Sequence, residues 1–362
     1  MRKKYFVIVG LVLAILIFTL VGCGKGNTTN VNPSPSPSSA SWQYLGTSGS
    51  ASIDESAELS MTISSSGIPY LAYVNYDNNL RVMVFSSGSW HSITPVGVTS
   101  ASNLSVCSDA SGNIYLAYED SSYKISVQKY NGSSWSVIGS SFTEIGSSNP
   151  QVLIDSVGNL NFIYVDGSDN IKYLEYNGSG WSSPSIVGQG MNPSMSISNS
   201  DLVYVGYTGT GGDGLVVRKF NGTSWELQGG DLASNLNNNP SIAIDSNNNI
   251  YIAYQDNVDQ RLCVQKYNGS SWALVGNSNP LTSTYSKSIQ TSVDSNNNFY
   301  VAYIENRACF VQKWNGSAWI FVGSSTGIVS DVGGSCFAMS NNMPYIAFTT
   351  NSDDMASVMK YQ

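Results

Sequence analysis

Short runs in which hydrophobic residues dominate follow one another along residues 42–362, and clusters of Asn, Gly and Ser separate them. The run Ile-Tyr-Ile-Ala-Tyr at residues 250–254 is representative, because alternate side chains of a strand point to opposite faces and both faces here are apolar. A strand that is apolar on both faces has to be covered from both sides. The pattern therefore predicts short β-strands in sheets that pack face to face.

Tryptophan marks a repeat of this strand pattern. Seven tryptophans recur at intervals of 48, 45, 46, 44, 47 and 47 residues: Trp42, Trp90, Trp135, Trp181, Trp225, Trp272 and Trp319. One repeat contains four strand-like runs, at residues 240–245, 250–254, 262–267 and 271–276. A period of about 40 to 50 residues made of short strands is typical of the blades of a β-propeller. We therefore expect each repeat to form one four-stranded blade.

The two ends of the repeat series complement each other. Six repeats are complete, but the last one, residues 335–362, lacks a fourth strand. The segment Trp42–Gly46 resembles the fourth strand of other repeats, for example Trp135–Gly139. Because folded proteins avoid long unpaired strand edges, these two ends should pair. The fold class that we expect is all-β: a seven-bladed β-propeller of four-stranded antiparallel blades, closed by pairing of the N-terminal strand with the C-terminal blade.

The dipeptide Asn-Gly recurs between the third and fourth strands of five repeats. It begins at Asn131, Asn177, Asn221, Asn268 and Asn315. Asn-Gly is the preferred sequence of a two-residue hairpin turn in which both central residues have positive φ. We therefore predict tight two-residue hairpins at these five places.

The composition agrees with an all-β chain and limits its partners. Only 11% of residues are charged, and Gly (34 residues) and Tyr (22 residues) are abundant, which disfavours a helical protein. Sixteen Lys and Arg against 24 Asp and Glu give a net charge of −8. A surface this negative does not attract phosphate backbones, so we expect no nucleic-acid partner. No cofactor motif is present, and the sequence favours no particular oligomeric state.

The first residues have the pattern of an export signal. Arg2, Lys3 and Lys4 precede an apolar run from Tyr5 to Val21. The run ends at Leu20-Val21-Gly22-Cys23, which resembles the lipobox of bacterial lipoproteins, where the cysteine thiol is lipidated. A plain transmembrane anchor is the alternative. We expect a signal peptide at 1–22, lipidated Cys23 and a Ser/Pro/Asn-rich tether at 23–41, and a propeller at 42–362. The propeller would then lie in the cell envelope, outside the cytoplasm, anchored by lipid in the cell membrane or outer membrane.

The repeats resemble those of bacterial secreted or lipid-anchored proteins with seven-bladed β-propellers. A second resemblance is to the Asp-box of sialidase-type propellers, because segments such as Gly269–Trp272 keep its spacing from glycine to tryptophan. The aspartate of that motif is replaced by an aromatic residue, for example Tyr267. The resemblance therefore implies the propeller fold without sialidase activity.

The sequence assigns no catalytic or metal-binding residue. His91 is the only histidine, so neither a catalytic triad nor a multi-histidine zinc site can form. Loops such as Asp245–Asn249 resemble calcium loops in part but lack their glycine and glutamate, which favours ordinary turns. Four cysteines follow Cys23, and their spacing matches no metal motif: Cys107, Cys263, Cys309 and Cys336. We expect buried thiols, with a Cys263–Cys309 disulfide as the alternative.

Polar residues follow the second strand of most repeats, at the end of the blades where we expect one mouth of the central channel. They are Asn75, Asp120, Asp166, Asp256 and Glu305, which we predict as ligand-binding residues. Two positions earlier the strands carry Tyr73, Tyr118, Tyr164, Tyr207, Tyr254, Tyr303 and Phe348. Carboxylates beside aromatic rings suit the hydroxyl groups and apolar faces of sugars, although packing and solvation explain the same residues.

Three functional classes fit these observations. The leading one is a non-enzymatic cell-surface lipoprotein whose propeller binds a protein or a glycan. The second is a carbohydrate-active enzyme, a glycosidase or lyase, because paired carboxylates are invisible in sequence. The third is a structural component of the envelope, since a propeller specifies no function by itself.

Overall fold

The computed structural model describes residues 40–47, 56–75, 77–98, 100–139, 148–211, 214–230, 232, 239–256, 260–276, 280–352 and 355–362. The chain divides into two units, Met1–Ser39 and Ala40–Gln362, and the described residues all belong to the second. The predicted signal peptide, Cys23 and the tether up to residue 39 lie outside them. Within the ranges given, no helix is long and apolar enough to cross a membrane.

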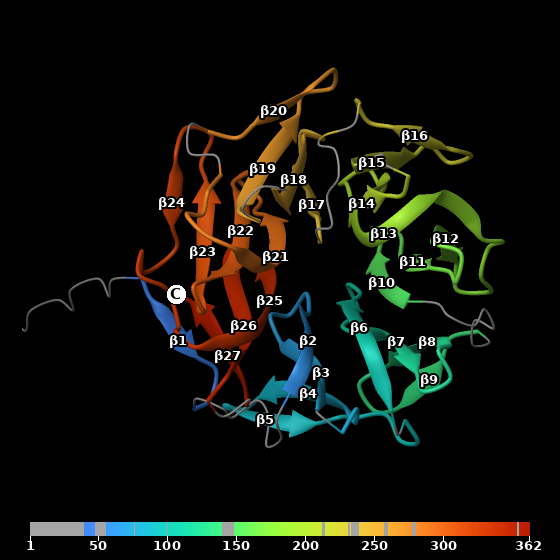
Figure 1. Ribbon diagram of the computed structural model, residues 1–362. Helices are drawn as coiled ribbons and strands as arrows, with labels where there is room; N and C mark the ends of the chain where they lie inside the picture. The colour runs from blue at the N-terminus through green and yellow to red at the C-terminus, as the bar shows by residue number, and fades with distance from the viewer. Residues whose placement is uncertain are drawn as a thin grey trace, which may run out of the picture. The chain divides into compact units, whose positions relative to one another are not determined.

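The described residues form antiparallel sheets and confirm the predicted all-β class. Five sheets have four strands each (Figure 1). In four of them the strands follow one another in chain order; the fifth, which contains both ends of the repeat series, is described below. The first contains β2 (Ser56–Ile63), β3 (Pro69–Asn75), β4 (Leu80–Ser86) and β5 (Ser89–Ser92). The second contains β6 (Ala101–Ser108), β7 (Ile114–Asp120), β8 (Ile125–Tyr130) and β9 (Trp135–Val137). The third contains β17 (Ser241–Ile244), β18 (Ile250–Gln255), β19 (Leu262–Tyr267) and β20 (Trp272–Leu274). The fourth contains β21 (Ser286–Val293), β22 (Phe299–Glu305), β23 (Ala308–Trp314) and β24 (Trp319–Phe321).

The sixth sheet has seven strands because one long strand serves both of its halves. It runs through β10 (Ser148–Ile154), β11 (Leu160–Val165), β12 (Asn170–Tyr176), β13 (Ser185–Ile197), β14 (Val203–Gly209), β15 (Leu215–Phe220) and β16 (Trp225–Leu227). Residues 185–189 of β13 pair with β12, and residues 190–197 pair with β14. We expected two separate four-stranded sheets here. They are joined because β13 is the fourth strand of one and continues without a break as the first strand of the next.

The predicted pairing between the two ends of the repeat series is observed. β1 (Trp42–Tyr44) pairs with β27 (Ala356–Tyr361), which continues to β26 (Met343–Thr350) and β25 (Val332–Ser340). Backbone hydrogen bonds join Ser41 N to Gln362 O (2.8 Å) and Gln362 N to Ser41 O (3.0 Å). Figure 1 shows β1, in blue, beside β27, in red. The beginning and the end of the unit thus share one sheet.

The innermost strands form a closed series. We call β2, β6, β10, β13, β17, β21 and β25 the inner strands; each contacts the next, and β25 contacts β2. The buried hydrophobic side chains of the described residues form clusters between neighbouring sheets, as where Ile125 and Val127 pack against Leu160 and Phe162. The second strands are buried on both faces, as predicted: every residue of β3 and β11 is buried. The core therefore lies between the sheets and surrounds the axis.

Each of the seven periodic tryptophans ties its strand to the preceding unit. The indole Nε1 of Trp90 donates to Leu45 O (2.9 Å), that of Trp272 to Gln228 O (2.8 Å) and that of Trp319 to Val275 O (3.0 Å). Trp42, Trp135, Trp181 and Trp225 make corresponding bonds to Val322 O, Ile93 O, Ile138 O and Ser185 Oγ. The 44- to 48-residue period of tryptophan is therefore the period of the contact between neighbouring units.

The Asn-Gly hairpins differ from the prediction. Tyr130 pairs with Trp135, which leaves a four-residue loop in which Gly132 (φ 95°) has positive φ and Asn131 does not. The side chain of Asn131 accepts hydrogen bonds at Oδ1 from Ser133 N (3.0 Å) and Ser134 N (2.9 Å). The prediction of a two-residue turn was wrong because an asparagine side chain can replace a backbone carbonyl in a turn, which stabilises a longer loop.

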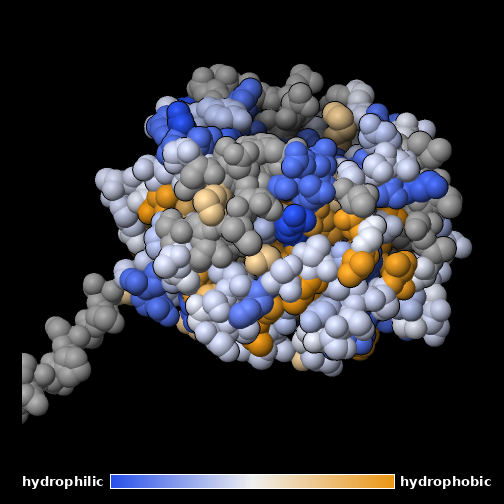
Figure 2. Space-filling model, turned by 90° about the horizontal axis from the view of Figure 1, so that it is seen from below, coloured by the Kyte–Doolittle hydropathy of each residue, from blue (hydrophilic) through white to orange (hydrophobic). Residues whose placement is uncertain are grey.

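The outer surface is mostly polar. Figure 2 shows a largely hydrophilic face with a few patches of hydrophobic side chains. Several exposed hydrophobic residues lie on the short outer strands two positions after the tryptophan: Tyr44, Val137, Leu227, Leu274 and Phe321. Each of them lies on the outer strand of a different unit, so they recur with the repeat and do not form one continuous patch.

Candidate functional site

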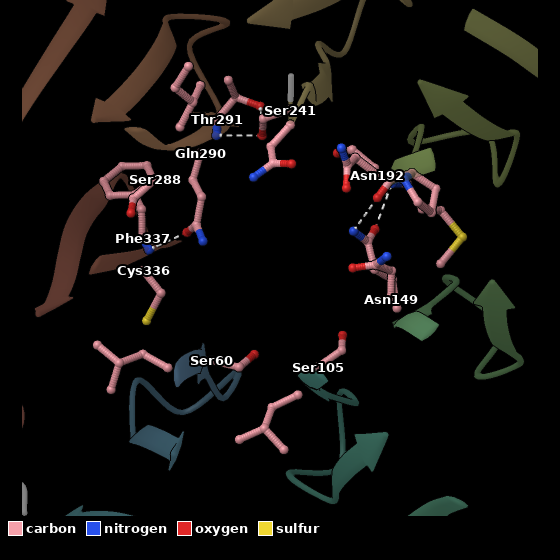
Figure 3. Close-up of a pocket in the computed structure, with 18 of the residues that line it drawn as sticks. Ser60, Ser105, Asn149, Asn192, Ser241, Ser288, Gln290, Thr291, Cys336 and Phe337 are labelled. Atoms are coloured by element: carbon pink, nitrogen blue, oxygen red, sulfur yellow. Dashed lines mark hydrogen bonds between the residues drawn. The ribbon is translucent and has the colours of Figure 1, made fainter. Parts of the chain in front are cut away.

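A polar cavity of about 580 Å³ lies at the centre of the inner strands. It is lined by residues of all seven inner strands, and Figure 3 shows their side chains directed into it. Ser, Thr, Asn and Gln make up half of the lining residues. A concave space with many hydrogen-bonding groups is the usual form of a small-molecule site, which makes this cavity the candidate functional site.

Two sets of side chains follow the inner strands along the cavity. The mouth ring, at or near the start of the strands, is Glu58, Asn103, Asn149, Asn192, Asn239 and Ser288. The seam ring, two residues further along, is Ser60, Ser105, Gln151, Ser194, Ser241, Gln290 and Cys336. Residues of both sets line the cavity, and in most of these strands a β-bulge lies between them.

A repeated β-bulge presents the mouth ring. One extra residue interrupts the pairing of six inner strands, and in four of them a residue at φ of about +50° lies there: Asn103 (53°), Asn149 (51°), Asn192 (53°) or Ser288 (51°). Asparagine tolerates this left-handed conformation better than most residues. Bulges turn side chains away from the regular pleat and are frequent beside binding sites. The recurring asparagine thus provides both the local geometry and the amide group.

The seam ring is occupied with holding neighbouring inner strands together. Ser60 Oγ accepts a hydrogen bond from Val106 N (3.1 Å), and Ser105 Oγ accepts one from Val152 N (3.1 Å). The same link continues from Gln151 to Met195, from Ser194 to Ile242, from Ser241 to Thr291 and from Gln290 to Phe337. At the corresponding place β25 carries Cys336. The hydroxyl and amide groups of this ring therefore stabilise the contacts between neighbouring inner strands.

Half of the mouth ring, by contrast, makes no side-chain contact of this kind in the part of the chain that the structure describes. The side chains of Asn192, Asn239 and Ser288 make no hydrogen bond within the residues described. Asn149 Nδ2 has only a long contact with Ser148 Oγ (3.4 Å). Their amide and hydroxyl groups can therefore donate to and accept from a ligand without breaking a protein contact.

Two carboxyl groups meet at one side of the mouth. Glu58 accepts from the backbone N–H groups of Asn103 (2.8 Å) and Leu104, and Asn103 Nδ2 donates to Glu119 Oε2 (2.7 Å). Burial, with the charge of Glu119, raises the pKa of Glu58 despite these two hydrogen bonds. Burial also raises the pKa of Glu119, which is 5% exposed. Such a pair can hold or transfer a proton, which is the chemistry of a general acid or base.

The five predicted ligand-binding residues lie at the same end of the sheets. Asp120 and Glu305, for example, pair with the first residues of β6 and β21. Asn75 Oδ1 accepts from Asn79 N (2.8 Å), and Asp120 Oδ1 accepts from Ser122 N (2.8 Å), so both stabilise hairpins. None of the five lines the central cavity as described. Their role in binding a ligand stays a prediction.

The other three predicted residues make comparable contacts. Asp166 accepts from Ser168 N (2.9 Å) and lies 3.4 Å from Lys172 Nζ, while Asp256 lies 3.6 Å from Arg261 Nε. Burial raises the pKa of Asp166, but its hydrogen bonds to Asn170 and its neighbours outweigh this and lower it. Glu305 Oε1 accepts from Ser283 N (2.8 Å) and Thr284 N (3.0 Å).

The aromatic residues at the ends of the second strands do not offer open ring faces. Tyr73, Tyr118, Tyr164, Tyr207, Tyr254, Tyr303 and Phe348 are each at most 5% exposed. The hydroxyl groups of Tyr118 and Tyr303 accept from Gln128 Nε2 (2.8 Å) and Gln312 Nε2 (2.6 Å). Burial is the main cause that raises the pKa of Tyr254 to about 12. These rings pack between the sheets rather than against a ligand.

The remaining candidates of the sequence analysis have structural contacts. Cys107, Cys263, Cys309 and Cys336 are buried free thiols, so the alternative disulfide is absent from the described residues. His91 lies exposed on β5, where its Nε2 contacts Ser89 Oγ (3.0 Å). In the loop that resembles a calcium site, Asp245 Oδ2 accepts from Asn249 Nδ2 (2.6 Å) and Oδ1 accepts from Asn249 N (2.8 Å). The carboxylate of that hairpin is thus used by the turn itself.

The mouth ring was missed by the sequence analysis although it leaves a signal. The tripeptides Asn103-Leu-Ser105, Asn149-Pro-Gln151, Asn192-Pro-Ser194 and Asn239-Pro-Ser241 stand at the same place in successive repeats. The signal is this recurrence of a polar residue two positions before another at the entrance of an inner strand. The carboxylates after the second strand are conspicuous because they are charged, whereas the amides are neutral.

No family model matches the sequence, and no curated protein is similar to it. Solved structures do resemble the fold. Polysaccharide lyase Uly1 has a TM-score of 0.61 at 9% identity over 86% of this chain and 90% of its own. The ulvan lyase PL25 bound to -[GlcA(1-4)Rha3S]- has a TM-score of 0.60 at 12% identity over 86% and 94%. The six-bladed fucose-binding lectin of Aleuria aurantia has a TM-score of 0.50 at 15% identity over 73% and 93%. At these identities the likeness shows the fold alone, which is a β-propeller.

Proposed function

We propose that this protein is a non-enzymatic glycan-binding propeller of the cell envelope, with the sugar bound at the mouth ring. The observation that carries the proposal is the set of amide and hydroxyl groups of Asn192, Asn239 and Ser288, which have no hydrogen bond in the described structure and border a cavity of about 580 Å³. Sugars present alternating donors and acceptors, which such groups match. Both lectins and polysaccharide lyases occur among the structural neighbours, which supports a carbohydrate ligand.

We further propose that the propeller has seven blades. The inner strands form a closed series of seven within the described residues, and β13 belongs to two blades, which accounts for six sheets. The seven tryptophan contacts between neighbouring units support the same count. A crystallographic count of blades tests it, and a six-bladed ring would contradict it.

Lipid anchoring through Cys23 is the part of the proposal that rests on sequence. The export-signal pattern, the lipobox-like ending and the Ser/Pro/Asn-rich segment up to residue 41 support a tethered domain outside the cytoplasm. Metabolic labelling with a fatty acid, compared between the natural chain and Cys23→Ala, tests it. Equal labelling of the two would contradict lipidation at this residue.

An enzyme of the lyase or glycosidase class is the second candidate, because Glu58 and Glu119 form a pair of carboxyl groups with raised pKa values beside the cavity. Proton abstraction from a sugar carbon or protonation of a leaving group needs a group of this kind. Chain shortening of a bound polysaccharide that is lost in Glu58→Gln would favour this candidate over the non-enzymatic one.

The test is a glycan-binding screen of the full chain, purified in detergent, in matched variants. Asn192→Gly removes one mouth-ring amide while glycine keeps the positive φ of 53° without strain. Asn248→Gly is the control, because Asn248 is an exposed hairpin asparagine with φ 61° and lies away from the cavity. We expect binding of at least one glycan, weakened about tenfold by Asn192→Gly, the loss of about one net hydrogen bond, and unchanged by Asn248→Gly.

Other outcomes of the screen separate the alternatives. Absence of binding to any glycan by the folded protein would contradict the proposal and favour a protein partner or a structural role. The screen also includes Asp256→Asn. Weaker binding in that variant, with unchanged thermal stability, would extend the site to the five residues predicted after the second strands.

A further inference from the structure

The charged side chain that lines the cavity is negative, and no positive one lines it in the part of the chain described. The lining residues of the described cavity include no Lys, Arg or His, and Glu58 is the only carboxylate among them. Glu119 lies beside it, bridged by Asn103, and neither carboxyl group has an ion pair with a described cation. Burial is the main cause that raises the pKa of both Glu58 and Glu119, and a neighbouring carboxylate adds to it in each case.

Three of the described cations at this end of the sheets are already paired. Lys172 lies 3.4 Å from Asp166, Arg261 lies 3.6 Å from Asp256, and Arg307 contacts Asp331. Lys287 precedes Ser288 of the mouth ring, but its Nζ donates to Gly333 O (2.7 Å) and it does not line the cavity. A ligand in the cavity therefore meets amides, hydroxyls and one carboxylate.

We infer that the mouth ring selects uncharged glycans and rejects those with uronate or sulfate groups, and that Glu58 is the residue that determines this selectivity. The inference rests on the proposed glycan-binding function. Recognition of a carboxylate or sulfate normally uses Arg or Lys, because an anion loses its water on binding and needs charge-assisted hydrogen bonds in return. Here an anionic sugar would lose water and also face a carboxylate at close range.

Neutral sugars meet no such penalty. The amides of Asn192 and Asn239, which have no hydrogen bond among the described residues, can donate to and accept from hydroxyl groups, and the carboxylate of Glu58 can accept from them. The saccharide bound by the ulvan lyase of similar fold, -[GlcA(1-4)Rha3S]-, carries glucuronate and sulfate groups. This chain is therefore inferred to combine the same fold with an opposite choice of glycan charge.

The experiment measures binding of the full chain to matched polymers that share a backbone: dextran with dextran sulfate, and fully methyl-esterified polygalacturonate with free polygalacturonate. We expect the neutral member of a bound pair to bind at least tenfold more tightly. Glu58→Gln removes the charge, so it should raise the affinity for the anionic member at least tenfold, whereas the affinity for the neutral member should fall, because an amide accepts fewer hydrogen bonds from hydroxyl groups than a carboxylate does. Glu226→Gln is the control for net charge, because Glu226 is exposed on β16, away from the cavity, and should leave both affinities unchanged.

The outcomes separate the inference from the function on which it rests. Equal or tighter binding of the anionic polymers by the natural chain would overturn the inference while leaving glycan binding intact. Selectivity for neutral polymers that Glu58→Gln does not relax, in a variant with an unchanged melting temperature, would overturn the role of Glu58. Absence of binding to all polymers in this set and in the glycan screen would overturn the proposed function itself. The comparison of polymers by the natural chain remains decisive if Glu58→Gln fails to fold.

Discussion

The indole Nε1 of Trp42 donates a 2.7 Å hydrogen bond to the carbonyl oxygen of Val322, so the first strand of the propeller is joined to a residue 280 positions later. Trp42 also packs against Tyr361, with ring centroids 5.4 Å apart. The closing sheet is therefore secured on two sides, by β27 through backbone pairing and by the preceding sheet through the tryptophan.

We predict that Trp42→Ala lowers the free energy of unfolding by about 3 kcal/mol, because it removes a large packed side chain and the contact between two sheets. Trp42→Phe keeps an aromatic ring and loses the N–H group, and should cost about 1 kcal/mol. Denaturant unfolding followed by far-ultraviolet circular dichroism measures both. An unchanged midpoint for Trp42→Ala would contradict the role of this strand in closing the domain.

Gly323 faces the same tryptophan and permits a second test. It has φ 96°, and a Cβ placed there would lie 2.7 Å from Trp42 Cδ1. Gly316 has nearly the same φ, 95°, with no atom within 4 Å of such a Cβ. Gly316→Ala should therefore cost about 1 kcal/mol from backbone strain alone, and Gly323→Ala a further 1 to 3 kcal/mol, roughly, from overpacking. Equal costs in thermal unfolding would show that the contact with Trp42 is not limiting.

The buried carboxyl group of Glu119 predicts a pH dependence of stability. Its pKa is raised in the folded protein, so the folded state binds more protons than the unfolded state once the pH exceeds the ordinary pKa of glutamate. Stability is then lost as the pH rises from there through the folded pKa. Glu119→Gln removes this loss, so the variant should gain in denaturation midpoint relative to the natural protein as the pH increases. A constant difference across that range would exclude Glu119 as the titrating group.

The four buried thiols should be almost unreactive in the folded protein. Burial raises the pKa of Cys309 and of Cys336 to about 12, so their thiolate fraction at pH 8 is lower than that of a free cysteine by about three orders of magnitude. Site-resolved labelling by a maleimide, read by mass spectrometry, should detect Cys107, Cys263, Cys309 and Cys336 only after unfolding. Rapid labelling of Cys336 alone in the native state would indicate that the cavity admits the reagent.

The repeat makes the fold predictable, whereas the site depends on geometry that the repeat conceals. The spacing of Trp42 and Trp319 predicts the pairing of the ends, because each tryptophan marks one structural unit. The continuous pairing of β13 is not predictable in this way, since nothing in residues 185–197 distinguishes it from two strands.

The residues predicted at the end of the channel and the residues that line the cavity differ in an instructive way. Asp120 and Asp166 stand out by their charge, yet their oxygens accept hydrogen bonds from backbone N–H groups of their own hairpins. Asn149 and Asn192 enter the cavity because a β-bulge turns them inward, and no periodicity of strands reveals a bulge.

The position of β1 also decides how the domain responds to force. The chain enters the propeller at Ala40 and passes at once into β1, whose three residues form the outer strand of the closing sheet. Any tension on the preceding segment is therefore carried first by the hydrogen bonds between Ser41 and Gln362 and by the Trp42 indole. If this strand detaches under load, the sheet of β25, β26 and β27 is left with an open edge, so the resistance of the domain to pulling at its N-terminal end depends on a strand of three residues.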